Sequence, residues 1–120
     1  MTISTTDHNL LQLCFDRQEY AWQSFVDRYV GLVTHVVSHT VQTQSLTTLP
    51  QEQEQLVIEV FRQFAANDYK LLQSFRQQSS LATFLTILSR RIIIQAIQTQ
   101  KRAESLNKAT QVEASAYPEA

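Results

Sequence analysis

SSLATFLTILSRRIIIQAIQTQKR, the segment from Ser79 to Arg102, decides the fold of this chain. Either Ser79 or Ser80 can accept hydrogen bonds from the free amides of a first helical turn. Apolar residues then recur at three- and four-residue spacing, as they do on the buried side of a helix: Leu81, Phe84, Leu85, Leu88 and Ile92. The segment therefore predicts a helix of about 23 residues, roughly 34 Å long.

The composition of the whole chain predicts further helices and no sheet. Among 120 residues there are one glycine and two prolines, and hydrophobic residues make up 43%. Hairpins and tight turns need glycine and proline, so their scarcity favours an all-α protein. The length suits one domain with its own core, in which Trp22 and Phe61 are expected as anchors. We expect a compact bundle of about four helices.

Periodicity and capping residues place the other helices. A short helix is expected to begin at Asp7 and a second near Glu19. Segment 42–49 is polar and threonine-rich without periodicity, which predicts a loop, and Pro50 suits the first turn of a third helix.

Domain boundaries follow from the same patterns. Asn67-Asp68 is expected to end the third helix, and 69–75 to form a short helical connector. The sequence predicts a helical domain over 7–102, a disordered start over 1–6 and a polar, flexible tail over 103–120.

Cysteine usage and hydropathy predict a cellular compartment. One cysteine excludes an intramolecular disulfide and fits a reducing environment. The start, MTISTTDHNLL, lacks the basic region and the apolar run of a signal peptide. No apolar run approaches the roughly 20 residues of a membrane span. We expect a soluble cytoplasmic protein that does not bind a membrane.

Charge is strongly segregated along the chain. Residues 1–68 hold eight acids and three bases, a net charge of −5, whereas residues 69–103 hold six bases and no acid, a net +6. Such segregation favours a face that meets a polyanion, and the alternative is a solvated basic face. The bases are Lys70, Arg76, Arg90, Arg91, Lys101 and Arg102.

Few residues are arranged for catalysis or metal binding. The chain has no glycine-rich phosphate loop, and Cys14 lies on the apolar side of a short helix, where a core role is favoured over a nucleophile. His35 and His39 share a helix face, but zinc needs three or four ligands, and only His8 or Cys14 could be added to the pair. We therefore expect no metal, no cofactor and no enzyme activity.

The order of several motifs resembles the second conserved domain of bacterial sigma factors, especially the extracytoplasmic-function group. DRQEYAWQSFVDRYVGLVTHVV is similar to the opening helices of that domain, and QLVIEVF is similar to its polymerase-binding helix. SSLATFL followed by a basic helix is similar to its DNA-binding segment. The resemblance covers roughly residues 7–102 and implies a sigma-like helical bundle.

The resemblance implies two binding surfaces. The first docks on the clamp helices of the RNA polymerase β′ subunit through Gln55, Ile58, Glu59 and Arg62, where Gln55 and Ile58 replace an aspartate and a glutamine of the family. The second binds the non-template strand of the −10 promoter element. The residues carried over to it, together with the neighbouring bases, are Arg76, Phe84, Arg90, Arg91, Gln95, Lys101 and Arg102.

Phe84, Arg91 and Gln95 replace a tryptophan, an asparagine and an aspartate of the family. Affinity for nucleic acid then depends on charge, and base specificity becomes uncertain. The given sequence ends at Ala120 without the family's helix-turn-helix domain, which reads the −35 element.

Ile93, Ile94 and Ile97 extend the apolar surface of the last helix beyond one stripe. Either the helix is enclosed on several sides, or an apolar strip is exposed and binds a partner. We expect the second, with at least one of Ile93 and Ile97 exposed. This strip favours an alternative function, in which a sigma-like fold binds an anti-sigma protein, another sigma factor or itself. An unrelated structural bundle is the third possibility.

Overall fold

The structure is a computed structural model that describes residues 5–44, 48–76 and 79–116, with side chains described over 9–44, 48–76 and 79–107. These residues form four α-helices and no strand, which confirms the all-α bundle. The helices are α1 (Thr5–Phe15), α2 (Ala21–Thr43), α3 (Pro50–Gln73) and α4 (Leu81–Ala116).

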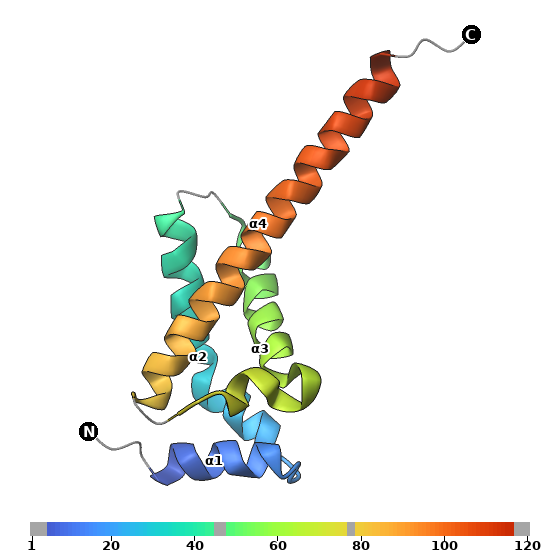
Figure 1. The fold of residues 1–120 in the computed structure, drawn as a ribbon. Coiled ribbons are helices and arrows are strands. Elements are labelled where there is room, and N and C mark those ends of the chain that lie inside the picture. The colour runs from blue at the N-terminus through green and yellow to red at the C-terminus, as the bar shows by residue number, and fades with distance from the viewer. Residues whose placement is uncertain (1–4, 45–47, 77–78, 117–120) are drawn as a thin grey trace.

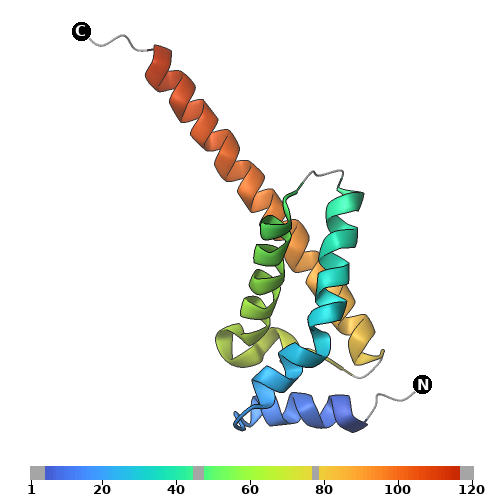
Figure 2. The same ribbon diagram turned by 180° about the vertical axis from the view of Figure 1, so that it is seen from behind.

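The arrangement has two layers (Figure 1). α2 and α3 run antiparallel, side by side, and α4 crosses one side of this pair. Seen from behind, α2 and α3 lie in front of α4 (Figure 2). α1 lies across the end of the bundle where α4 begins. The core therefore lies between the α2–α3 pair and α4, and α1 closes one end of it.

The core buries more of α4 than the sequence pattern predicts. The stripe of Leu81, Leu85, Leu88 and Ile92 is buried as expected. Ile93 and Ile97 are also buried, with 0% and 6% of their surface exposed, so the prediction that at least one of them is accessible is wrong. Ile94 is half-buried.

The geometry of the bundle explains this burial. α4 packs against both α2 and α3, so two neighbours cover a wider arc of its surface than one neighbour would. Ile93, Ile94 and Ile97 therefore do not form the partner-binding strip expected of them.

The two expected core anchors differ in burial. Phe61 is buried, at 7% exposed, and its ring meets that of Phe25 edge-on. Trp22 is only half-buried. Its indole stacks on Phe25, with ring centroids 5.4 Å apart, and also contacts Phe61 and Tyr69. Trp22 therefore lies at the edge of the core, where part of its surface remains accessible.

The starts of three of the four helices agree with the sequence signals, and α2, expected to begin near Glu19, begins at Ala21. Pro50 begins α3 as predicted, and the Glu52 carboxylate accepts a hydrogen bond from the Leu49 amide at 3.4 Å. Ser80 caps α4, because its Oγ accepts a hydrogen bond from the Thr83 amide at 3.1 Å. α1 begins at Thr5, so the predicted boundary at Asp7 lies inside that helix.

The ends of two helices lie further along the chain than predicted. α2 continues to Thr43, into the segment 42–49 that was expected to be a loop, of which 45–47 lie outside the described residues. α4 continues to Ala116, so the prediction that this helix ends at Arg102 is wrong. Polar and small residues after Arg102 extend a helix that packing has already nucleated. Residues 1–4 and 117–120 also lie outside the described part of the chain.

The third helix was expected to end at Asn67-Asp68, and the backbone leaves the helical conformation there, but α3 resumes after this break and ends at Gln73. Asn67, Asp68 and Tyr69 all have left-handed backbone conformations, with φ of 55°, 56° and 62°. Asn and Asp tolerate this region better than other residues, whereas Tyr needs support from its surroundings. Tyr69 finds it against the rings of Phe15 and Trp22. Arg17 forms an ion pair with Asp68, which ties the α1–α2 turn to this break.

One segment of α4 also has the composition of a membrane span. Leu81–Asn107 is long enough and apolar enough to cross a membrane, but the core helix of a soluble protein can have the same length and composition. Its apolar side is buried against α2 and α3, and Arg90 and Arg91 are exposed in its middle, where a bilayer would disfavour them. The packing is that of a core helix in a soluble bundle.

Replacing Phe64 by alanine tests the core directly. Phe64 has no exposed surface, and its ring contacts Phe25 and Phe61. Phe64→Ala should lower the free energy of unfolding by on the order of 3–5 kcal/mol, because a cavity is left in a packed core. Ile58→Ala is the control, since Ile58 is 52% exposed, and it should cost about 1 kcal/mol or less. Equal losses in urea unfolding would contradict this core.

Candidate functional site

One prominent surface feature is an apolar groove between α2 and α3, on the side of the pair that α4 does not cover. It has a volume of about 750 Å³. α2 contributes Trp22, Val26, Val30, Thr34 and Val37 to its walls. α3 contributes Pro50, Gln53, Glu54, Val57, Ile58, Phe61, Arg62 and Ala65. We call this feature the α2–α3 groove.

Two rows of apolar residues on α2 build the groove and the core. Phe25, Tyr29 and Val33 recur every four residues and are buried in the core. A second row lines the groove and is offset from the first by one position along the helix. It consists of Trp22, Val26 and Val30. In the sequence the two rows together make one unusually wide apolar stripe, and that width was the available signal for the groove.

Exposed aliphatic side chains make the groove suitable for a protein partner. Val30 is 41% exposed and Ile58 is 52% exposed, and they come from opposite walls. Apolar surface in a concave site favours burial against another apolar surface. A single amphipathic helix is the ordinary occupant of a groove between two helices.

The four residues that the resemblance assigns to polymerase binding divide into two groups. Ile58 and Arg62 line the α2–α3 groove. Gln55 and Glu59 lie on α3 outside the groove lining, Gln55 exposed and Glu59 half-buried. The structure thus brings Ile58 and Arg62 together with α2 residues that were not expected at this site, Val26 and Val30 above all.

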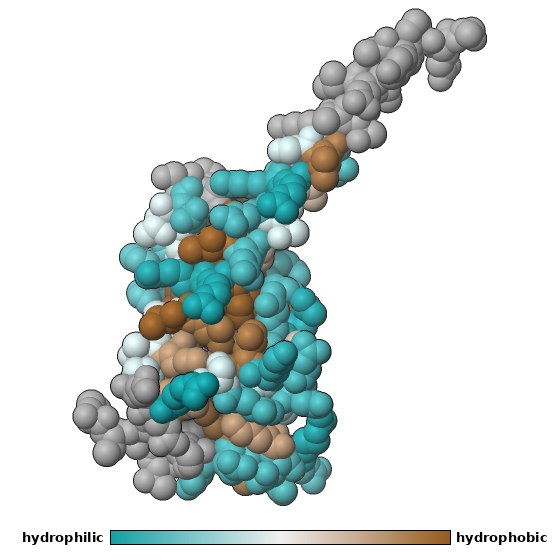
Figure 3. Space-filling view, viewed as in Figure 1, coloured by the Kyte–Doolittle hydropathy of each residue, from teal (hydrophilic) through white to brown (hydrophobic). Residues whose placement is uncertain are grey.

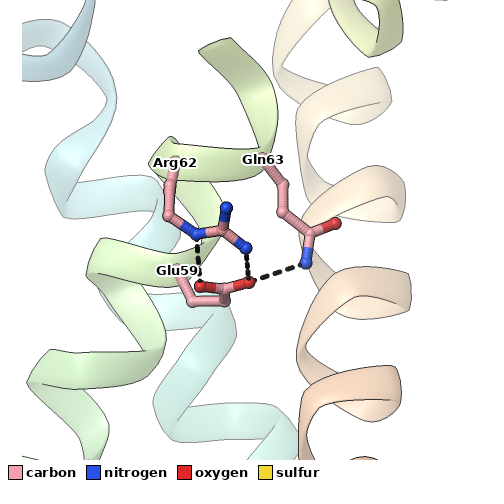
Figure 4. Close-up of polar contacts among 3 residues, drawn as sticks. All are labelled: Glu59, Arg62 and Gln63. Atoms are coloured by element: carbon pink, nitrogen blue, oxygen red, sulfur yellow. Dashed lines mark hydrogen bonds and ion pairs between the residues drawn. The ribbon is translucent and has the colours of Figure 1, made fainter. Parts of the chain in front are cut away.

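Glu59 is occupied by contacts within its own helix (Figure 4). The Arg62 guanidinium donates to both carboxylate oxygens, at 2.8 and 2.5 Å, and the Gln63 amide donates at 2.9 Å. Hydrogen bonds from Arg62 and then Gln63 lower the pKa of Glu59 to about 2. The same contact raises the pKa of Arg62 and holds its side chain at the rim of the groove.

A second surface lies on the exposed side of α4. It carries four exposed bases in two pairs of neighbours. The first pair is Arg90 and Arg91, and the second, eleven residues further along the helix, is Lys101 and Arg102. Eleven residues make about three turns and about 16 Å, so the two pairs lie on the same side of the helix. Figure 3 shows this side of the molecule, where hydrophilic surface surrounds smaller hydrophobic areas. Ile87, 57% exposed, is one apolar residue of α4 in solvent.

The other residues expected to bind nucleic acid are Gln95, Arg76 and Phe84. Gln95 is exposed on α4, and Arg76 is exposed on the connection that follows α3. Phe84 is half-buried, and its ring contacts that of Phe75 with centroids 5.0 Å apart. Part of the Phe84 ring is therefore already used within the chain.

Cys14 and the two histidines of α2 form no reactive or metal-binding site in the described residues. Cys14 is fully buried in the core, as expected, and burial raises its pKa to about 11, so the thiol is protonated. His35 and His39 are exposed with ring centroids 6.4 Å apart. Over the described ranges, no three His, Cys, Asp or Glu side chains are close enough to hold a metal ion.

Comparison with known protein families, characterised proteins and solved structures finds no match to this chain. The resemblance to sigma factors therefore depends on the sequence motifs alone.

Glu59→Gln should reveal the ion pair through its pH dependence. The folded-state pKa lies below the ordinary value of 4.5, so the stabilisation is complete above pH 4.5 and is lost as the pH falls toward 2. At neutral pH the variant should lose about 0.5 kcal/mol of unfolding free energy, since the pair is at the surface. Near pH 2, where about half of the Glu59 carboxylate is protonated in the folded chain, the difference from the wild type should be clearly smaller.

Urea unfolding at both pH values measures this difference. Glu54→Gln removes the same charge outside the contact with Arg62 and Gln63, and so controls for net charge. A loss in Glu59→Gln that is the same at both pH values would contradict the ion pair.

Proposed function

We propose that this chain is a sigma-factor-like transcription protein of the bacterial cytoplasm, without catalytic activity of its own. In this proposal the α2–α3 groove docks on the β′ subunit of RNA polymerase, and the exposed side of α4 binds the non-template strand of promoter DNA. The two surfaces belong to different helices, so both partners can bind at once.

The observation that carries the proposal is the location of Ile58 and Arg62. The motif resemblance assigns both residues to polymerase binding, and both line the α2–α3 groove. The residues that the resemblance assigns to DNA are exposed on α4 and on the connection before it. Burial of the groove's aliphatic walls supplies affinity, and Arg62 at the rim favours an acidic residue on the partner.

Binding of DNA by α4 would depend mainly on charge. Exposed arginine and lysine side chains neutralise phosphates and release counterions, which gives affinity without sequence preference. The two pairs of bases, about 16 Å apart along the helix, suit a strand that follows the helix over a few nucleotides. Phe84 adds one half-buried aromatic ring at the start of α4.

A second function is favoured by Ile58 alone. This residue replaces a glutamine of the family and exposes an aliphatic side chain in an apolar groove. A groove of this kind also suits an anti-sigma protein or another sigma factor, with no promoter recognition. Ile93 and Ile97 no longer support that alternative, because they are buried.

Removal of two arginines tests the nucleic-acid surface. Arg90→Ala combined with Arg91→Ala should weaken binding to single-stranded DNA about equally for all sequences, because these charges meet phosphates. The slope of log affinity against log salt should fall by about 1 to 2. Fluorescence anisotropy of labelled oligonucleotides at several salt concentrations measures both quantities.

Arg17→Ala combined with Arg28→Ala is the matched control, since it removes two bases that lie outside α4. Binding that is absent at low salt, or that both double variants weaken equally, would rule out α4 as the DNA surface.

Docking on polymerase can be followed through Trp22, which lines the groove and is the chain's only tryptophan. A purified fragment containing the β′ clamp helices should shift the emission of Trp22 to shorter wavelength, because the partner excludes water from the indole. Ile58→Glu should weaken binding of the fragment by at least tenfold, since it places a charge in an apolar interface.

Ile87→Glu is the control for this experiment, because Ile87 is similarly exposed but lies on α4 outside the groove. Tight binding of the β′ fragment by Ile58→Glu would place polymerase docking elsewhere on the chain.

A further inference from the structure

His35 and His39 form an exposed pair on α2 that belongs neither to the α2–α3 groove nor to the basic side of α4. They are four residues apart, so both side chains lie on one side of the helix. Their rings are nearly parallel, with 10° between the ring planes and 6.4 Å between the centroids. Within the described part of the chain, neither ring has another interaction. The pair therefore presents two imidazoles side by side to solvent.

Two imidazoles at this spacing suit one transition-metal ion. Histidines at positions i and i+4 of a helix bind one zinc ion in metalloproteases. Zinc binds an imidazole nitrogen at about 2.0 to 2.1 Å, so two rings on one ion have centroids roughly 5 Å apart. Both side chains are exposed, so rotation about their χ angles can close the remaining gap of about 1 Å. The pair can thus chelate zinc without any movement of the backbone.

The surroundings of the pair neither repel a cation nor supply a third ligand. Gly31, Gln42 and Thr43 are the exposed residues one helical turn away, and none of them is charged. Cys14 is buried in the core. α1, which carries His8, lies across the end of the bundle where α2 begins, whereas the pair lies in the second half of α2. One chain therefore supplies two of the four ligands that a tetrahedral zinc site takes.

A second copy of the chain can supply the other two ligands. The last turns of α2 form an outer edge of the bundle in both ribbon views (Figures 1 and 2). A second copy is the one partner that carries a matching pair of exposed histidines. Two copies that meet at this edge across a two-fold axis bring four identical imidazoles to one point. The expectation of no metal applied to the ligands of one chain, and two chains together complete the set.

We infer that a Zn²⁺ ion bound by His35 and His39 of two copies joins this chain into a dimer. The assembly closes at two chains, because the ion then has its full set of four ligands. Val26 and Val30 precede the two histidines by nine residues each, which places them about 180° away around α2. The dimer therefore leaves the α2–α3 groove of each chain open.

This site is independent of the proposed function, since zinc binding needs neither polymerase nor DNA. Where the proposed function also holds, zinc doubles the number of grooves in the assembly and closes neither of them. Because the histidines lie outside the groove and outside α4, a test of the zinc site and a test of polymerase docking can fail separately.

Sedimentation equilibrium of the full chain, with and without zinc, tests the inference. The apparent mass should rise from one chain to two when one zinc is added per two chains, and excess EDTA should reverse the rise. His35→Gln and His39→Gln should each abolish it, because either variant leaves two imidazoles per two chains. Both side chains are exposed, so the helix content measured by circular dichroism should not change. Magnesium should not replace zinc, since it prefers oxygen ligands.

His8→Gln is the matched control, because it removes the chain's third histidine and leaves the pair intact. This variant should form the same zinc-dependent dimer as the wild type.

Cobalt spectroscopy identifies the ligands. Co²⁺ can replace zinc, and its visible absorption is intense in tetrahedral sites and weak in octahedral ones. Titration of the wild type should give the intense bands and should end at one ion per two chains. No charge-transfer band from sulfur to cobalt should appear, because the Cys14 thiol is buried and protonated. The intense bands should be absent from His35→Gln.

Three results would overturn the inference. The first is a chain that stays monomeric with zinc, even where one ion binds per chain, because two histidines and water then form a chelate at the surface of a single chain. The second is a zinc-dependent dimer that survives both His35→Gln and His39→Gln. The third is loss of the dimer in His8→Gln at unchanged helix content, which would place a histidine from outside the pair in the site.

Discussion

The burial of α4 against both α2 and α3 is the constraint on which the rest of the structure depends. Leu88 and Ile97 are both buried, at 6% exposed each, although their separation of nine residues places them about 180° apart around the helix. Two neighbouring helices are needed to cover so wide an arc. The bundle is therefore held together by one central helix that meets both members of an antiparallel pair.

Both candidate surfaces result from this packing. Because α4 covers only one side of the α2–α3 pair, the second apolar row of α2 remains uncovered and forms a groove with α3. Because the buried arc of α4 contains most of its aliphatic residues between Leu81 and Ile97, its four bases from Arg90 to Arg102 remain exposed. The apolar groove and the basic side of α4 are thus two surfaces of different chemical character.

Much of this architecture could be predicted from the sequence, and the exceptions have a physical reason. Periodicity and caps located the helices, Pro50 and Ser80 marked boundaries that the structure confirms, and Asn67-Asp68 marked a break within α3. These signals are local, because each one depends only on residues that are close together in the sequence. The burial of Ile93 and Ile97 depends on how many helices surround α4, which no local pattern specifies.

The candidate site was harder to predict for the same reason. Ile58 and Arg62 were identified through motifs, but their α2 partners Val26 and Val30 were not, because the groove requires two helices to be placed side by side. Glu59 was expected to meet a partner, and the structure instead pairs it with Arg62 and Gln63 in its own helix. A contact at a spacing of three or four residues is visible in sequence, but its competition with an external partner is not.

The central functional claim is that this fold docks on RNA polymerase. Affinity capture of the tagged chain from the lysate of its own organism, with the bound proteins identified by mass spectrometry, tests that claim most directly. The proposed function predicts that the β and β′ subunits are recovered with the chain and are lost when the bait carries Ile58→Glu. Capture of the intact chain without either subunit, under conditions in which polymerase is present in the lysate, would contradict it.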